Sequence, residues 1–491
     1  MMYPPPPFSE LGDIEVVADG DGRLHLFHLT LPNHDVIQHA ISDDGLRWTA
    51  LPPALRTGDP GDADDDQIWT MGVARDDAHS RWLMLYTTLA RADGGRVQRT
   101  GLAVSRDLVH WEKSPNNPVV SADARWYESD PATWGSVSWR DPKPLRLGGR
   151  WLATVAARET GGPLMRRGCI GLIGSDDGEQ WEALPPLFAP RRFWDLECPQ
   201  AFPIGDRWHL TAAIMEDRRQ RYWTAPAFGG PYETPPDGGI LAPAGHYAGR
   251  VTRWRDRDLL WCWHQPRLAE GWTATPRTVD WTPIRNPFGK TLAPPLELSP
   301  RPDGSLARAS FAGWDAFAGE AVAISPERAT RFHEAPTDGW RIDATGGRMD
   351  LLAASAPATD ARITGVLRLD ARHGGLAFRL DDEGGGYEIA LRPGSPTIEL
   401  RTWLPTTEPR DDSRGYRVEI LLLEDLFRTI PLGEPVPFSL LMVGPYLEFS
   451  LFGEVVLATF SGKRQDGAWG IWAESGAISG HDLAVAPMRR P

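Results

Sequence analysis

The sequence is poor in cysteine and lysine, and it has no long apolar run. Its three cysteines, Cys169, Cys198 and Cys262, form no C-x-x-C pair, so neither a disulfide framework nor a zinc site is expected. Arginine is abundant, whereas lysine occurs only at positions 113, 143, 290 and 463, which we attribute to genome composition. No stretch of about 18 consecutive apolar residues occurs, so we expect no transmembrane helix.

The net charge and the N-terminal residues limit the binding partners and the cellular compartment that we expect. The formal net charge is -14, which disfavours nucleic acid and anionic membranes as partners. The opening residues, MMYPPPPFSE, have neither the basic region nor the apolar core of a secretory signal. Together with the scattered thiols and the initiating Met1, this predicts a complete, cytoplasmic protein.

Tryptophan, by contrast, is abundant, with 22 residues. The flat faces of its rings suit the apolar C–H faces of sugars, but tryptophan also fills the cores of β-sheets. We expect the second role for most of the 22 residues.

A repeated pattern of short aromatic strands runs through the first 265 residues. The strands are LHLFHL (24–29), WLMLYTT (82–88), WLATVAA (151–157), WHLTAAI (208–214) and LLWCWH (259–264). Three of them are followed by a strand that ends in Ser, a polar turn and a Trp; these segments are residues 41–51, 104–114 and 173–184. A repeat of roughly 50–70 residues built from strands indicates stacked or radial β-units.

The repeat predicts an all-β protein that begins with a five-bladed β-propeller. Amphipathic helical stretches are nearly absent, which argues against a parallel sheet with crossover helices. Five units of about four strands each match a propeller over residues 8–292. Equivalent positions of the innermost strands then converge on a central funnel.

A second domain is expected after this repeat. The segment TLAPPLELSPRPDGS (291–305) is rich in proline and turn residues, and residues 293–330 read as a linker and the start of the next domain. Residues 331–491 contain many strands with period-2 alternation and tight turns, which predicts a β-sandwich. This expected sandwich holds no cluster of residue types suited to catalysis or metal binding, and we expect it to support the propeller.

Three acids occupy similar positions ahead of the repeated strands. Asp13 in LGDIE, Asp141 in WRDPK and Glu197 in FWDLECPQAF precede the first, third and fourth of these strands by 10 or 11 residues. Each acid alone reads equally well as an exposed strand or turn residue. Independent turn acids have no reason to share a register, so the shared register predicts that the three meet at the funnel.

Paired carboxyl groups in a funnel are typical of glycoside hydrolysis, in which one acts as an acid and the other stays ionised. The aromatic neighbours of Glu197 predict that desolvation keeps this group protonated near neutral pH. Arg140 should keep the adjacent Asp141 ionised. Asp13 and Glu15 alternate with apolar residues and should therefore point to the same side of a strand.

At these motifs the sequence resembles glycoside hydrolase family 32, the invertase and fructanase family, in the clan that also holds family 43. The segment WRDPK (139–143) is similar to the family's Arg-Asp-Pro motif, and LECP (196–199) to its Glu-Cys-Pro motif. QHAISDDGLRW (38–48) and PPLEL (294–298) resemble two further family segments. The resemblance covers nearly the whole chain and implies a five-bladed propeller followed by a β-sandwich.

The resemblance also implies roles for residues of this chain. Asp13 would be the nucleophile, Glu197 the general acid and base, and Asp141 a stabiliser of the transition state. The expected sugar-binding residues are Arg140, Trp69, Thr70, His39, Gln38, Tyr247 and Trp194. The implied reaction is retaining hydrolysis of a furanoside, with a β-fructofuranoside in a small oligosaccharide as the default carbohydrate substrate.

Several alternatives stay open at this point. The family's opening Asn-Asp-Pro-Asn-Gly is absent, and Gly12-Asp13-Ile14-Glu15 stands in its place. An inverting hydrolase of the family 43 type, a glycosyl transferase, or a catalytically silent sugar-binding propeller would retain the same acids. The acidic segment GDADDDQ (61–67) lacks the Gly and terminal Glu of a calcium loop, so no metal or cofactor is expected.

Overall fold

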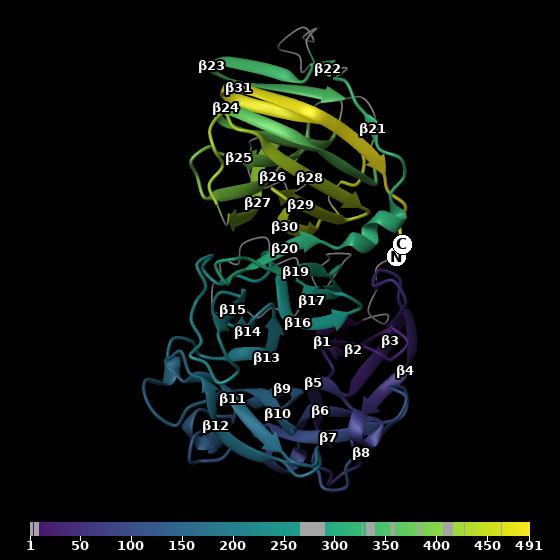
Figure 1. Cartoon of the computed structure of the whole chain (residues 1–491), viewed down its shortest axis with the longest axis vertical. Coiled ribbons are helices and arrows are strands. Elements are labelled where there is room, and N and C mark those ends of the chain that lie inside the picture. The colour runs from purple at the N-terminus through teal and green to yellow at the C-terminus, as the bar shows by residue number, and fades with distance from the viewer. Residues whose placement is uncertain are drawn as a thin grey trace. The chain divides into compact units, whose positions relative to one another are not determined.

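The computed structural model divides the chain into two compact units (Figure 1). The described residues are Tyr3, 9–265, 290–326, 328–329, 339–354, 359–381, 384–405, 416–426, 428–462 and 464–491. The first unit contains the described residues up to Arg308 except Pro243–Gly245, and the second contains Pro243–Gly245 together with those of Ala309–Pro491. Within these residues there is no α-helix, and no helix is long and apolar enough to span a membrane.

The first unit is a five-bladed β-propeller, as the repeat predicted. Blade one is β1 (Glu10–Ala18), β2 (Leu24–Leu31), β3 (Val36–Ser42) and β4 (Thr49–Arg56). Blade two is β5 (Gln67–Asp76), β6 (Arg81–Leu89), β7 (Arg99–Ser105) and β8 (Trp111–Lys113). Blade three is β9 (Trp139–Leu147), β10 (Arg150–Arg158), β11 (Gly168–Ser175) and β12 (Glu182–Phe188).

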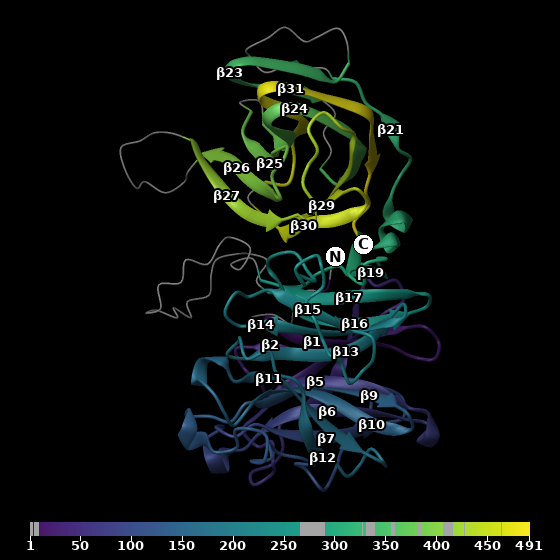
Figure 2. The same cartoon turned by 60° about the vertical axis from the view of Figure 1, so that its left-hand side comes forward.

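The last two blades complete the ring. Blade four has three strands, β13 (Leu196–Ile204), β14 (Arg207–Ile214) and β15 (Gln220–Ala225). Blade five is β16 (His246–Trp254), β17 (Arg257–His264), β19 (Leu296–Pro300) and β20 (Leu306–Ser310), with β18 (Thr291–Leu292) paired to β17. The innermost strands β1, β5, β9, β13 and β16 adjoin one another around a closed ring, and Figure 2 shows β1, β13 and β16 side by side.

Apolar side chains fill the space between neighbouring blades. One cluster, including Phe27, Met71 and Tyr86, joins blades one and two, and others join blades two and three and blades three and four. Many of the tryptophans therefore serve as core residues, as expected; Trp139 and Trp151 are completely buried. Because the apolar side chains pack between the blades, the innermost strands can direct polar side chains toward the axis.

The repeated Ser-turn-Trp segments are the hairpins that join the third and fourth strands of blades one to three. In each, the carboxylate of an Asp two residues after the Ser accepts backbone N–H groups of the turn; the three acids are Asp44, Asp107 and Asp177. Such Asx-type hydrogen bonds fix a tight turn independently of tertiary contacts. The sequence repeat therefore reports a local backbone structure that recurs once per blade.

Every innermost strand contains a β-bulge where it pairs with the second strand of its blade. The register shifts lie between Leu11 and Ile14, Trp69 and Met71, Arg140 and Lys143, Glu197 and Gln200, and Tyr247 and Arg250. Three bulges hold a non-glycine residue in the left-handed region: Asp141 (φ 59°), Cys198 (φ 48°) and Ala248 (φ 51°). Bulges often re-aim side chains near active sites.

The second unit is a β-sandwich formed by one strongly bent sheet of eleven strands. These strands are β21 (Val322–Ala323), β22 (Arg328–Ala329), β23 (Arg341–Ala354), β24 (Ala361–Leu380), β25 (Gly386–Leu391), β26 (Thr397–Pro405), β27 (Tyr416–Asp425), β28 (Val436–Val443), β29 (Tyr446–Leu451), β30 (Glu454–Phe460) and β31 (Ala468–Pro487). Its core includes Ile363, Phe378, Ile389, Phe449 and Ile471. The propeller and the sandwich confirm the all-β fold class predicted from sequence.

Candidate active site

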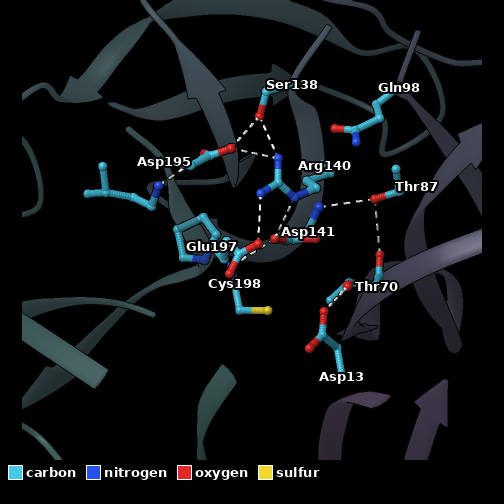
Figure 3. A network of polar contacts seen from close by, with 12 residues as sticks. Asp13, Thr70, Thr87, Gln98, Ser138, Arg140, Asp141, Asp195, Glu197 and Cys198 are labelled. Atoms are coloured by element: carbon cyan, nitrogen blue, oxygen red, sulfur yellow. Dashed lines mark hydrogen bonds and ion pairs between the residues drawn. The ribbon is translucent and has the colours of Figure 1, made fainter. Parts of the chain in front are cut away.

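The three predicted acids lie close to the beginnings of three innermost strands, and so at the same end of the propeller. Asp13 is on β1, Asp141 on β9 and Glu197 on β13. Asp13 and Asp141 lie within their bulges, and Glu197 immediately precedes its own. The bulge common to all the innermost strands is the structural origin of the register that the sequence showed. Figure 3 shows the polar network in which the acids meet.

Asp13 is held by two donors from neighbouring blades. Thr70 Oγ1 donates to Asp13 Oδ2 at 2.5 Å, and Trp263 Nε1 donates to Asp13 Oδ1 at 3.0 Å. The carboxylate is partly buried. An oxygen of Asp13, an oxygen of Asp141 and the Cys198 sulfur all lie within 4.8 Å of one another. The two hydrogen bonds fix the orientation of Asp13, and its carboxylate stays near that of Asp141.

Asp141 is buried and takes a strained backbone conformation. Its Oδ2 accepts the backbone N–H of Cys198 at 2.8 Å, and its own N–H donates to Thr87 Oγ1 at 3.0 Å. A left-handed φ at a non-glycine residue costs about 1–3 kcal/mol, which other contacts must offset. Burial raises the pKa of Asp141 to about 6, with Asp13 and Glu197 adding to the rise and Arg140 opposing it. Arg140 therefore opposes the rise in pKa without cancelling it, and Asp141 is still ionised near neutral pH.

Arg140 is the buried cation that joins the acids. It contacts Asp195 (Nη1–Oδ2, 2.8 Å), Glu197 (Nη2–Oε1, 3.0 Å) and Asp141 (Nε–Oδ2, 3.6 Å), and it also donates to Ser138 Oγ at 2.5 Å. Burial alone would lower the pKa of this guanidinium, but the three carboxylates raise it well above its usual value. Arg140 thus stays charged and fixes Asp141 relative to Glu197.

Glu197 has polar partners in place of the apolar surroundings expected from its sequence. Its Oε1 accepts from Arg140 and its Oε2 from the Tyr247 hydroxyl, and 18% of its side chain is exposed. The aromatic neighbours point elsewhere: Phe193 packs into the core of blades three and four. The desolvation argument made for Glu197 from its neighbours in sequence is therefore not supported by the contacts of its carboxylate.

Of the other predicted sugar-binding residues, some belong to the network around the acids and others lie outside it. Thr70 and Tyr247 are part of the acid network, and Tyr247 lies one residue before its bulge, as Glu197 does. Trp69 is next to Thr70 on β5, where its Nε1 donates to Gln67 Oε1 at 2.6 Å. Trp194 lies in the loop before β13, against the guanidinium of Arg158.

The structure does not bring His39 and Gln38 to the acids. Both are on β3, two strands out from the innermost strand of their blade. The ring of His39 is buried, stacks on Phe27 and is hydrogen-bonded to His25 at 2.9 Å, and burial lowers its pKa to about 3. The prediction that His39 and Gln38 bind sugar beside the acids is not supported, because the third strand of a blade lies farther from the axis than the innermost strand.

A second layer of charged residues, which sequence reasoning missed, lies directly beyond the acids on the same strands. Glu15 is two residues after Asp13, and Lys143 is two residues after Asp141. Both point to the axis, because they meet each other and Arg250 although the three residues come from different innermost strands, β1, β9 and β16. The Lys143 ammonium forms an ion pair with Glu15, and Arg250 Nε lies 3.5 Å from Glu15 Oε2. The alternation of Asp13 with Glu15 was the one signal for this layer in the sequence.

Arg250 connects this layer to the bulges. Its Nη1 donates to the carbonyls of Pro199 (2.8 Å) and Cys198 (3.2 Å), and its Nη2 to the carbonyl of Asp141 (3.4 Å). These carbonyls belong to the left-handed segments that carry two of the acids. Arg250 therefore stabilises the backbone conformation that aims Asp141 and Glu197.

Asp13, Asp141 and Cys198 are near enough to one another to be considered as metal ligands. Both oxygens of Asp13 and one of Asp141 already accept hydrogen bonds. Burial raises the pKa of the Cys198 thiol well above its usual value, which disfavours the thiolate that binds metals. These hydrogen bonds and the raised pKa of the thiol make the three residues, as they stand, poor ligands for a metal ion.

This chain is similar in sequence to a known family of enzymes. Residues 6–232 match the model of the glycosyl hydrolases family 32 N-terminal domain. A β-fructofuranosidase, insoluble isoenzyme, from Arabidopsis thaliana is 29% identical over 215 residues, which is 41% of this chain and 35% of the relative. One from Daucus carota is 26% identical over 318 residues, 55% of this chain and 50% of the relative. The matches thus span half or less of these relatives.

The fold is shared with solved structures along the whole chain. Fructan 1-exohydrolase IIa from Cichorium intybus superposes with a TM-score of 0.71 at 16% identity, covering 100% of this chain and 97% of that one. The Bombyx mori GH32 β-fructofuranosidase superposes with a TM-score of 0.64 at 17% identity, covering 98% and 91%. At this identity the likeness establishes the propeller-plus-sandwich fold.

Proposed function

Residues 6–232 are a family 32 glycosyl hydrolase N-terminal domain, and from this premise we propose that the chain is a glycosidase that cleaves a furanoside by retaining double displacement. The proposed substrate is a β-fructofuranoside in a small oligosaccharide, the class named for its relatives. The observation that carries the proposal is the convergence of Asp13, Asp141 and Glu197 in one polar network.

In the first half-reaction, Asp13 attacks the anomeric carbon while the bond to the leaving oxygen breaks. Glu197 gives its proton to that oxygen, so the leaving group departs as an alcohol. Thr70 and Trp263 hold Asp13 in position for the attack. Orientation of this kind removes much of the entropic cost of bringing the nucleophile to the carbon.

In the second half-reaction, Glu197 acts as a base and takes a proton from water, which attacks the anomeric carbon and releases Asp13. Arg140 and the Tyr247 hydroxyl donate hydrogen bonds to Glu197, and these contacts orient its carboxyl group for the proton transfer. Asp141, ionised above pH about 6, accepts hydrogen bonds from sugar hydroxyls in both steps.

An NMR time course tests the function and the mechanism together. The substrates are sucrose, a fructo-oligosaccharide series and aryl furanosides, and the Asp13→Asn variant is the control. We expect the retained anomer to be released first, with activity reduced at least 10³-fold in the variant. First release of the opposite anomer would reassign Asp13 as the base of an inverting enzyme, and binding without turnover would indicate a silent sugar-binding propeller.

A further inference from the structure

The described part of the first unit exposes three large apolar side chains, and they gather in one place. Trp134, Leu164 and Met165 are 47%, 39% and 62% exposed. Trp134 lies in the loop between β8 and β9, and the other two lie in the loop between β10 and β11. Both loops approach Arg158, which lies 5.8 Å from the ring centroid of Trp134 and donates to the Leu164 carbonyl at 2.7 Å.

Trp134, the aromatic member of this patch, packs on the half-buried Trp194, and the two rings rest on a rigid base. Their ring centroids are 3.8 Å apart, with the planes tilted by 51°. Beneath Trp194 lies the Arg158 guanidinium, 3.6 Å from the ring centroid. Arg158 is itself buried and bound to Glu128 and to the Trp194 carbonyl, both at 2.7 Å. The pair is therefore held in place before any ligand arrives.

This aromatic pair lies at the same end of the propeller as the proposed acid. Trp194 is three residues before Glu197, and Asp195 between them pairs with the same Arg140 that binds Glu197. The pair is also at the end of the propeller where β9 and β13 begin and β10 ends, which is the end that holds the acids. The general acid must contact the leaving oxygen, so groups beside Glu197 face the leaving group, while Asp13 and Asp141 face the furanose.

We propose that Trp134, supported from behind by Trp194, forms a binding subsite for the leaving group, and that this group is a sugar ring with an apolar C–H face. The inference rests on the proposed function and specifies its substrate class. An exposed indole gains from stacking on such a ring, and a gathered apolar patch on an otherwise polar surface marks a binding site. A leaving group as small as methanol is too short to cover either indole.

Two substrates with the same fructosyl unit test the subsite. The leaving group is glucose for sucrose and methanol for methyl β-D-fructofuranoside. The parameters kcat and KM are measured for both substrates. For Trp134→Ala we expect kcat/KM on sucrose to fall about tenfold, mainly through KM, as expected for the loss of one stacked ring. The value on the methyl furanoside should change less than about twofold, because that substrate does not reach the indole.

Two variants control for the loss of an exposed side chain. Trp134→Phe retains an aromatic face and should recover most of the activity on sucrose, whereas Leu432→Ala removes a side chain that is 64% exposed in the second unit and should leave both substrates unchanged. Equal losses on both substrates in Trp134→Ala, or no loss on either, would overturn the subsite and leave the proposed function standing. If the unaltered protein cleaves neither substrate, the proposed fructosidase function fails, and the subsite fails with it.

Discussion

Two layers of charged residues on the innermost strands have opposite character. The outer layer contains Asp13, Asp141 and Glu197 with the cation Arg140, and the Glu197 side chain is 18% exposed. The inner layer, further along the innermost strands, combines two cations, Lys143 on β9 and Arg250 on β16, with the carboxylate of Glu15 on β1. The Glu15 and Arg250 side chains are completely buried.

The comparison shows how the propeller tolerates a cluster of acids. Buried charges of one sign are costly unless opposite charge and hydrogen bonds accompany them. The excess positive charge of the inner layer lies behind the carboxylates, and Arg250 also holds the carbonyls of their bulges. We therefore expect substitutions in the outer layer to change mainly rate, and those in the inner layer to change stability and the geometry of the site.

The largest effect is expected from Glu197→Gln in the outer layer. Without a proton donor, kcat on sucrose should fall about 10³- to 10⁴-fold. The loss should be much smaller on an aryl furanoside, whose leaving group needs little protonation. Steady-state kinetics on both substrates check this, with the melting temperature as the control for folding. An equal loss on both substrates would contradict the assignment of Glu197 as the acid.

In the inner layer, Arg250→Met should lower the free energy of unfolding by about 3–5 kcal/mol, because it removes a buried cation and leaves the carbonyls that it holds without their donor. Arg250→Lys retains the charge but not the forked geometry and should lose less. Denaturant unfolding measures the stabilities, and kcat and KM measured well below the transition report on the bulges. Unchanged kinetics in folded Arg250→Lys would show that the two layers are independent.

Asp141→Asn should separate stability from activity. The pKa of Asp141 is about 6 in the fold, above the 3.8 of a free aspartate side chain, so the folded state holds the proton more tightly than the unfolded chain. Stability is therefore lost as pH rises from about 4 to about 6, by up to about 3 kcal/mol. The asparagine variant should be more stable than the unaltered protein at pH 7, and nearly equal to it at pH 4.

The same ionisation should shape the activity profile. As pH falls through about 6, Asp141 takes up a proton, and it then accepts hydrogen bonds from sugar hydroxyls less well. We expect kcat/KM on sucrose to fall on this acidic side. Thermal melts of both proteins across the pH range accompany the rate profile. A destabilised Asp141→Asn at neutral pH would show that this carboxylate is favourably paired when ionised.

Thr70→Val should give the smallest effect. It removes one donor to Asp13, and the loss of a single hydrogen bond to a charged group corresponds to about tenfold in kcat. The buried site accepts valine because its shape matches threonine, so the melting temperature should hardly move. Thr70→Ser, which keeps the hydroxyl, is the matched control and should retain most of the rate.

The sequence alone was sufficient for the fold class and for the prediction that the three acids lie together. Hairpins held by Asp44, Asp107 and Asp177 are local structures, so they leave a repeat that can be read without knowing the packing. The same holds for the bulge that places Asp13, Asp141 and Glu197 in one register. The extended strands of the second unit were likewise visible as period-2 alternation.

Only the tertiary structure decided which side chains surround those acids. Trp263, Asp195 and Arg250 reach the site from other strands or loops, and nothing in their own segments marks them. His39 and the surroundings of Glu197 were misjudged for the same reason. Local hydrogen bonds set the backbone and its periodicity, but burial and charge pairing arise between residues that are distant in the sequence, and they exist only once the five blades have closed into a ring.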